Sequence, residues 1–265
     1  ISLGKTYPAS PPFIFRPEFP WVYWEGYQRL FTDTLYVRAY FVSVYNAAIA
    51  TLLCLLLGYP MALGLTRVSR AWRSFLLILV ILPFWTSFLL RVYAWMGLMG
   101  SNSWFNRALT SVWNSAVPQS WELTSIPMMN SNFAVILVMV YTYLPFMILP
   151  LMSALQGIDP SIEAAARSLG AGRVTAFRRI VLPLAMPGIQ AGCILVFVLS
   201  LSAYVTPSLI GGLRVKTMAV SVVDALIDTF QWPFGSAMAL LLSLTGALVV
   251  AVFARLTRMN WKIDR

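Results

Sequence analysis

Long apolar stretches alternate with short polar segments along this chain. No charged residue lies between Glu122 and Asp159, and none lies between Arg179 and Arg214. Uncharged apolar stretches of about 18 or more residues indicate membrane-spanning helices, because lipid offers backbone N–H and C=O groups no partner outside their own helix. The pattern therefore predicts an all-α, polytopic bundle of transmembrane helices. The expected spans cover residues 37–65, 74–91, 132–155, 184–210 and 233–256.

The segments outside the spans set the expected topology. Residues 1–36 are rich in proline and aromatic residues and are expected to be extracytoplasmic, ahead of a transmembrane domain at 37–256. The loop 97–131 is expected outside too, with a short helix lying on the membrane. Residues 257–265 are the expected cytoplasmic tail. Aromatic rings favour the membrane–water interface, and the expected anchors in the outer loop are Trp104, Trp113 and Trp121.

The number of expected spans, five, predicts on which side of the membrane each end of the chain lies. An odd number of spans places the first residue outside and the last inside. Because the chain starts with Ile1 directly at an outer loop, we expect a sixth helix to precede it. Arg91 ends the short second span and is expected to extend its side chain to the outer interface.

Composition and charge agree with a membrane protein. The chain is 59% hydrophobic and 11% charged, whereas soluble domains carry about 25% charged residues. The net charge is +10, but the basic residues adjoin apolar stretches instead of covering a soluble face. This placement favours the positive-inside rule over nucleic-acid binding. The basic residues expected in the cytoplasm are Arg67, Arg70, Arg73, Arg167, Arg173, Arg178, Arg179, Arg255, Arg258, Lys262 and Arg265.

The sequence does not favour an enzyme or a metal site. It contains no His, and Cys54 and Cys193 lie in apolar stretches, which favours packing residues over a disulfide. A zinc site or a membrane enzyme needs clustered His, Cys or carboxylates. Gly4-Lys5-Thr6 supplies only the end of a phosphate-binding loop. Hence no catalytic, metal or cofactor site is expected in this chain.

The most informative segment is the polar insert 156–183. Asp159-Pro160 is a helix start, because Asp caps free N–H groups and Pro needs none in the first turn. A helix is predicted at 160–169, a break at Gly170 and Gly172, and a second helix at 173–182. Glu163 and Arg167 stand four residues apart, so Glu163 either pairs with Arg167 or contacts a basic group on a partner.

The spacing within this insert resembles the cytoplasmic signature loop of bacterial ABC-importer permeases. Glu163-Ala164-Ala165 is followed by Leu169-Gly170 and then by Ile180 and Leu182-Pro183. In that family the loop docks into a groove on the ATPase subunit. The resemblance implies an ATPase-coupling role for Glu163, Ala164, Ala165, Gly170, Ile180, Leu182 and Pro183.

A wider resemblance covers nearly the whole chain from about Leu35. Its segments, residues 82–88, 91–95, 143–147, 186–192 and 232–235, are similar to spermidine/putrescine-type permeases. The resemblance implies a type I permease fold of six spans in the bacterial inner membrane, with a cytoplasmic C-terminus. It also implies several partners. These are a second, related permease subunit, two copies of a cytoplasmic ATPase that bind ATP and Mg, and an extracytoplasmic binding protein.

The substrate expected from this resemblance is a small cationic amine such as putrescine or spermidine. Aromatic faces attract ammonium groups, although aromatic residues in spans also serve as packing residues or anchors. The aromatic residues of the expected path are Trp85, Tyr93, Trp95, Tyr141, Tyr143 and Tyr204. Asp224 and Asp228 either attract a cation at the outer mouth or form a solvated face. The alternatives are a permease for an amino-acid derivative, an opine or a metal ion, and a stand-alone secondary transporter or channel.

Overall fold

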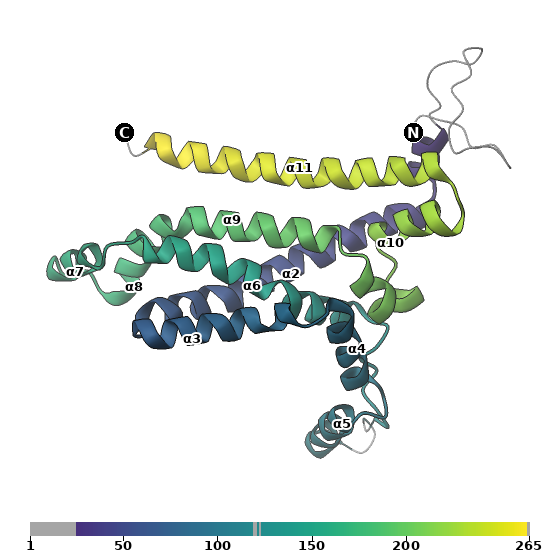
Figure 1. The fold of residues 1–265 in the computed structure, drawn as a ribbon, viewed down its shortest axis with the longest axis horizontal. Helices are drawn as coiled ribbons and strands as arrows, with labels where there is room; N and C mark the ends of the chain where they lie inside the picture. The colour runs from purple at the N-terminus through teal and green to yellow at the C-terminus, as the bar shows by residue number, and fades with distance from the viewer. Residues whose placement is uncertain (1–24, 119–120, 122, 264–265) are drawn as a thin grey trace, which may run out of the picture. The chain divides into compact units, whose positions relative to one another are not determined.

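The computed structural model describes residues 25–118, 121 and 123–263. Helices form almost all of its regular structure (Figure 1), and the described residues contain no β-strand. The α-helices are α1 (Glu25–Thr32), α2 (Thr34–Arg67), α3 (Arg70–Ile81), α4 (Phe88–Met99), α5 (Trp104–Ala116), α6 (Asn132–Gln156), α7 (Pro160–Ser168), α8 (Arg173–Ala176), α9 (Leu182–Leu201), α10 (Met218–Val223) and α11 (Trp232–Ile263). Short 3₁₀ turns occupy Leu82–Trp85 and Gly212–Arg214, and π-helical turns occupy Phe177–Val181, Pro207–Gly211 and Asp224–Asp228.

The chain folds as two compact units, to both of which α2, α6 and α11 contribute residues. The first unit comprises Ile1–Ala47, Phe88–Met139 and Leu201–Ala247. The second comprises Ala48–Ser87, Val140–Ser200 and Leu248–Arg265.

In the described part of the chain, four helical segments are long and apolar enough to cross a membrane. They are Thr34–Arg67, Asn132–Gln156, Arg173–Leu201 and Trp232–Arg255. Three of them match the predicted spans 37–65, 132–155 and 233–256. The last helix continues beyond the predicted end at residue 256, since α11 runs to Ile263.

The prediction for the fourth span, residues 184–210, is wrong at both ends. The helical segment starts at Arg173 and stops at Leu201. A separate π-helical turn follows at Pro207–Gly211. The helix is interrupted at residues 202–204 and resumes at Val205, just before this turn.

The prediction of one continuous second span at 74–91 is also wrong. Helix α3 passes into the 3₁₀ turn Leu82–Trp85, and the helix is interrupted at Thr86 and Ser87. The Thr86 N–H and hydroxyl both donate to the Pro83 carbonyl, at 3.3 and 2.8 Å, and so close the turn. Segments Arg70–Trp85 and Phe88–Ala116 amount to a fifth span only if they are counted as one broken span.

Arg91 therefore does not end an uninterrupted span. It lies in α4, after the break, with its guanidinium carbon 5.7 Å from the centre of the Phe88 ring.

A compact core in the first unit joins α1, α10 and α11. Leu30, Met218, Ala225, Phe234 and Met238 are buried together. The Tyr36 ring meets Phe234 edge-on at a centroid distance of 4.8 Å. The Met218 N–H donates to the Ser43 hydroxyl at 2.7 Å, which ties the start of α10 to α2.

Glycines allow close helix packing in the second unit. A Cβ placed on Gly188 would lie 2.5 Å from the Ala154 Cβ, and one on Gly192 would lie 2.7 Å from the Met147 sulfur. Helix α9 thus packs closely on α6 through the Gly188-x-x-x-Gly192 face. Small residues of this kind let two backbones approach within a membrane. Figure 1 shows α6 and α9 running side by side.

Candidate functional site

The polar insert begins with a capped helix, as the sequence predicts. The Asp159 carboxylate accepts a hydrogen bond from the Ser161 N–H at 2.9 Å, and Pro160 occupies the first turn of α7. This hydrogen bond favours the charged carboxylate and lowers the pKa of Asp159 from its ordinary value. A carboxylate at this position also interacts favourably with the helix dipole.

Helix α7 ends in a Schellman motif centred on Gly170. The Gly170 N–H donates to the Arg167 carbonyl at 2.9 Å, and the Ala171 N–H donates to the Ala166 carbonyl at 3.0 Å. Gly170 has φ +86°, in the left-handed region where residues with a Cβ are strained. No other atom lies within 4 Å of a Cβ built there. The need for glycine is therefore conformational and not steric.

The second predicted helix, 173–182, does not stop at Pro183. Helix α8 continues through the π-helical turn Phe177–Val181 into α9, so that Arg173–Leu201 is one helical segment. The Leu182 N–H donates to the Phe177 carbonyl, five residues earlier. A proline within a helix clashes with the carbonyl four residues before it. The wider turn places Pro183 in the first turn of α9 and so lets the helix continue.

The predicted coupling residues lie mostly on the surface of this insert. Ala164, Ala165, Gly170 and Pro183 are exposed, while Ile180 and Leu182 are partly buried. The side chain of Glu163 lies outside the described part of the structure, so the expected Glu163–Arg167 pair remains a prediction. The roles of all seven coupling residues likewise remain predictions.

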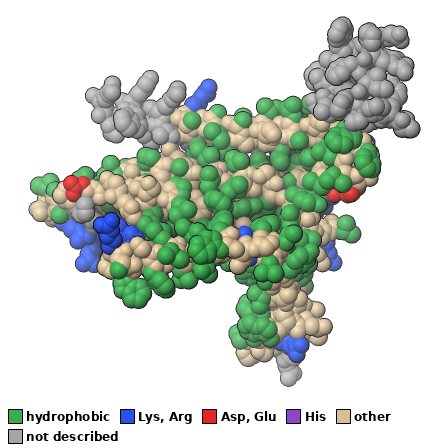
Figure 2. All heavy atoms as spheres, in the orientation of Figure 1, with side chains coloured by type: hydrophobic (Ala, Val, Ile, Leu, Met, Phe, Trp, Pro, Cys, Tyr) green, Lys and Arg blue, Asp and Glu red, His purple; other side chains and the backbone are tan. Residues whose placement is uncertain are grey.

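Two exposed apolar side chains on the same insert were not among the predicted coupling residues. Leu169 is 90% exposed and Val174 is 71% exposed. Leu169 directly precedes Gly170, which ends α7, and this position in the sequence could have indicated that its side chain is exposed. Beside Val174 lies an open hollow of about 350 Å³, lined by Thr175, Arg178 and Arg179 as well. Figure 2 shows Lys and Arg side chains gathered around α7 and α8.

The insert is fixed to the second unit through its buried side. Ala176 and Val181 are 1% and 7% exposed. The Phe177 ring meets Tyr59 of α2 edge-on, with centroids 5.8 Å apart. Helix α7 in turn contacts α8 and the π-helical turn. Direct packing therefore joins the insert to α2 and α9.

Arg73 has a structural role at the turn between α2 and α3 that the sequence did not reveal. Its guanidinium donates to the Leu65 carbonyl at 3.1 Å and to the Thr66 carbonyl at 2.9 Å. These carbonyls belong to the last turn of α2, where helical partners are missing. Arg73 therefore caps α2 and holds the tight turn before α3.

The candidate substrate-path residues are divided between the two units. In the second unit, Trp85 is 81% and Tyr141 37% exposed, while Tyr143 lies against Phe146 with centroids 6.5 Å apart. In the first unit, Tyr93 is 57% and Tyr204 39% exposed, and Trp95 is partly buried. Their contact with a substrate remains a prediction.

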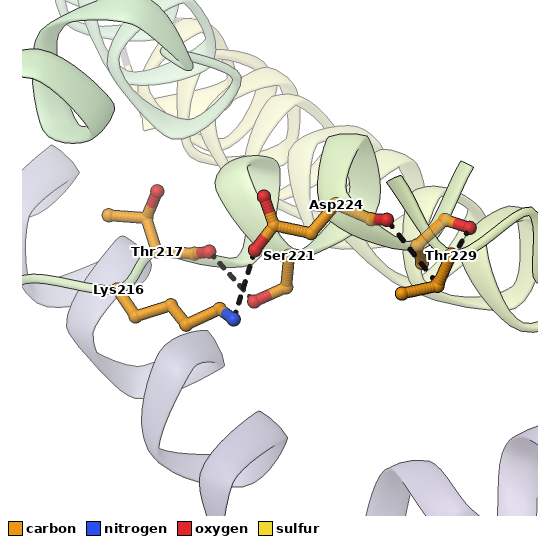
Figure 3. Close-up of polar contacts among 6 residues, drawn as sticks. Lys216, Thr217, Ser221, Asp224 and Thr229 are labelled. Atoms are coloured by element: carbon orange, nitrogen blue, oxygen red, sulfur yellow. Dashed lines mark hydrogen bonds and ion pairs between the residues drawn. The ribbon is translucent and has the colours of Figure 1, made fainter. Parts of the chain in front are cut away.

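The two outer aspartates share one π-helical turn, Asp224–Asp228, but differ in their surroundings. Lys216 Nζ lies 2.9 Å from an Asp224 carboxylate oxygen (Figure 3), whereas Asp228 is exposed. The Thr229 N–H donates to the Asp224 carbonyl at 3.0 Å and closes the turn. A cationic substrate would have to compete with Lys216 for Asp224, a partner that sequence spacing did not indicate.

The described residues contain no group of three or more His, Cys, Asp or Glu that could hold a metal ion.

Comparison with known proteins gives a consistent family match. Residues 54–259 match the model of the family described as "Binding-protein-dependent transport system inner membrane component". The chain is 37% identical over 241 residues to the spermidine/putrescine transport system permease protein PotB of Haemophilus influenzae, covering 91% of this chain and 82% of that protein. It is 36% identical over the same length to PotB of Escherichia coli K12, covering 91% and 85%.

A solved structure shares the fold at low sequence identity. It is the bacterial alginate ABC transporter in complex with an alginate pentasaccharide-bound periplasmic protein. One of its chains superposes with a TM-score of 0.70 at 14% identity, covering 90% of this chain and 83% of that chain. At this identity the likeness concerns the fold alone.

Proposed function

Because this chain belongs to the family of binding-protein-dependent transport system inner membrane components, we propose that it is the permease subunit of an ABC importer for a polyamine. Identity of 36–37% over 91% of the chain to two spermidine/putrescine permeases is the observation that carries the substrate class. Putrescine and spermidine carry ammonium groups, which exposed aromatic rings such as Trp85 and Tyr93 can attract by about 0.5–2 kcal/mol each.

The polar insert is the proposed contact with a separate ATPase, which would bind ATP and Mg. Its exposed Leu169 and Val174 offer apolar anchors, and Arg178 and Arg179 beside them offer charges for a rim. Apolar anchors within a polar surround are typical of protein–protein contacts. The capped ends of α7 and the Tyr59–Phe177 contact support the transmission of movement from such a partner to α2 and α9.

The proposed assembly rests on the family and on the proposed ATPase contact of the insert. It contains a second, related permease, two ATPase copies and an extracytoplasmic binding protein. The insert and the C-terminal end of α11 are placed in the cytoplasm, and the loop 97–131 outside. The support for this orientation is the gathering of Arg residues around α7 and α8.

Uptake by the complete importer in proteoliposomes tests the proposal. With ATP inside the vesicles, labelled putrescine should accumulate, and unlabelled spermidine should reduce its uptake while molybdate and maltose should not. An importer with a catalytically inactive ATPase serves as the matched control and should take up nothing.

Two outcomes would contradict different parts of the proposal. If putrescine did not accumulate while labelled molybdate or maltose did, the polyamine would be wrong as the substrate and the permease assignment would stand. Uptake that continues with the inactive ATPase would instead indicate a stand-alone transporter.

A further inference from the structure

Helix α5 turns its polar side toward the rest of its own unit. Asn106 is fully buried, at 0% exposed, and Thr110 one turn later is 5% exposed. The Asn106 amide nitrogen donates to the Ile126 carbonyl at 2.9 Å, and its amide oxygen accepts from the Ile126 N–H at 3.1 Å. This two-way pairing fixes the helix against the segment that leads into α6.

A second amide repeats the same arrangement two turns along the helix. The Asn114 amide nitrogen donates to the Leu123 carbonyl and its oxygen accepts from the Leu123 N–H, both at 3.0 Å. The Trp113 indole N–H donates to the Trp121 carbonyl at 3.3 Å. The rotational orientation of α5 is therefore set by side chain–backbone bonds near both of its ends.

The opposite side of α5 is apolar and exposed. Trp104 is 73%, Val112 65% and Leu109 37% exposed. A helix on the surface of a soluble protein has the reverse arrangement, with its apolar stripe facing the core. The arrangement suits a helix whose outer surroundings are more apolar than its inner ones.

We propose that α5 lies in the plane of the membrane, with this apolar side in the acyl-chain region of one leaflet. The helix is part of Phe88–Ala116, which together with Arg70–Trp85 meets the length and hydropathy criteria for a membrane segment. Its sequence contains no acidic residue, and its one cation, Arg107, stands on the polar side with its guanidinium 2.7 Å from the Asn102 carbonyl. A cation on the polar side and Trp on the apolar side are typical of interfacial helices.

The position of α5 in the chain gives this contact a mechanical role. The helix lies between the broken second span and α6, so a lipid-embedded α5 holds the start of α6 at a constant depth. The leaflet concerned is the outer one, since the loop 97–131 is proposed to be extracytoplasmic. The proposal does not depend on which substrate the importer carries.

Lipid-borne quenchers test the proposal in the complete importer, reconstituted in phosphatidylcholine–phosphatidylglycerol vesicles. With Cys54 and Cys193 replaced by Ala, Val112→Cys is labelled with a bimane fluorophore. Ser111→Cys is the matched control, since Ser111 is exposed but lies about 100° away around the helix. Lipids that carry a doxyl group near the ester should quench at least about threefold more at 112 than at 111, because the apolar side of an interfacial helix lies roughly 5–10 Å deep.

Equal quenching at the two positions would overturn the proposal. So would protection of position 112 from the quencher together with its crosslinking to the second permease, which would make the apolar side a protein interface. If Val112→Cys does not assemble, Leu109→Cys with the same control gives an independent reading of the same side.

Discussion

The Phe177 ring packs edge-on against Tyr59, with ring centroids 5.8 Å apart, and so joins the polar insert to the spanning helix α2. Such a contact contributes about 0.5–1.5 kcal/mol beyond the area that it buries. It is a direct connection between the polar insert and a spanning helix.

Replacing Phe177 by Ala should uncouple ATP hydrolysis from uptake. The exposed side of the insert is unchanged, so the ATPase should still bind, but its movement would no longer reach α2. We expect putrescine uptake per ATP hydrolysed to fall several-fold in proteoliposomes. Phe75→Ala is the matched control, because it removes the similar edge-on pair with Trp72, at 6.0 Å, on α3. An equal loss in both variants would speak against a specific connection.

Substitutions of Gly170 should follow backbone conformation and not size. At φ +86°, Gly170→Ala and Gly170→Val cost about 1–2 kcal/mol, whereas Gly170→Asn, which adopts this conformation more readily, costs less. Uptake should decrease in the order Gly, Asn, Ala, Val. Gly172→Ser is the control, because Gly172 has φ −64° at the start of α8 and Ser caps helices well. Normal uptake by Gly170→Val would contradict the role of the Schellman motif.

A charge at Gly170 gives a separate test of the docking surface. Asp adopts positive φ about as readily as Asn, so the pair of variants differs mainly in charge. Gly170→Asp should abolish uptake while membrane insertion and abundance stay normal, because an anion would stand in the proposed ATPase contact. If Gly170→Asp took up as much putrescine as Gly170→Asn, Gly170 would not lie in the ATPase contact.

The cap of α7 should be lost on acidification. The pKa of Asp159 is lowered in the folded state by the Ser161 N–H. Its stabilising effect is therefore complete above the ordinary carboxyl pKa and is lost as the pH falls through the lowered value. Amide protection in α7, measured by hydrogen exchange, should decrease below about pH 4. Asp159→Asn keeps a capping oxygen without the titration, so its protection should be insensitive to pH over this range.

Removing Lys216 should free the Asp224 carboxylate with little loss of stability. Both side chains are more than a third exposed, and pairs of this kind contribute about 0–1 kcal/mol. If Asp224 helps to attract a cation, Lys216→Ala should raise putrescine uptake at low ionic strength, and the gain should vanish at about 1 M salt. Asp224→Asn in the same background should cancel the gain. If uptake by Lys216→Ala did not change with salt, Asp224 would have no part in the substrate path.

Local signals in the sequence were sufficient for much of the candidate site. Asp159-Pro160 and Gly170 predicted the two ends of α7, because caps depend on a few neighbouring residues. Gly188 and Gly192 stand four residues apart, a spacing visible in the sequence, and in the structure they form the close contact of α9 with α6.

Features that depend on partners distant in the chain could not be predicted in this way. The interruption at Thr86 and Ser87 follows from how the Pro83 carbonyl is satisfied, and the spacing of apolar residues does not show it. Likewise, an apolar pattern reveals that α5 is amphipathic but not which side faces the protein, which the Asn106 and Asn114 bonds decide.

The π-helical turn Phe177–Val181 adds one residue to the helix that enters the membrane from the coupling surface. One extra residue rotates everything before it by about 100° around the helix axis, relative to a regular helix. A helical wheel drawn continuously from Arg173 to Leu201 would thus assign Val174 and Thr175 to the wrong face. Substitutions in this helix should therefore be chosen with two separate helical wheels, one for the residues before the π-helical turn and one for those from Leu182 onward.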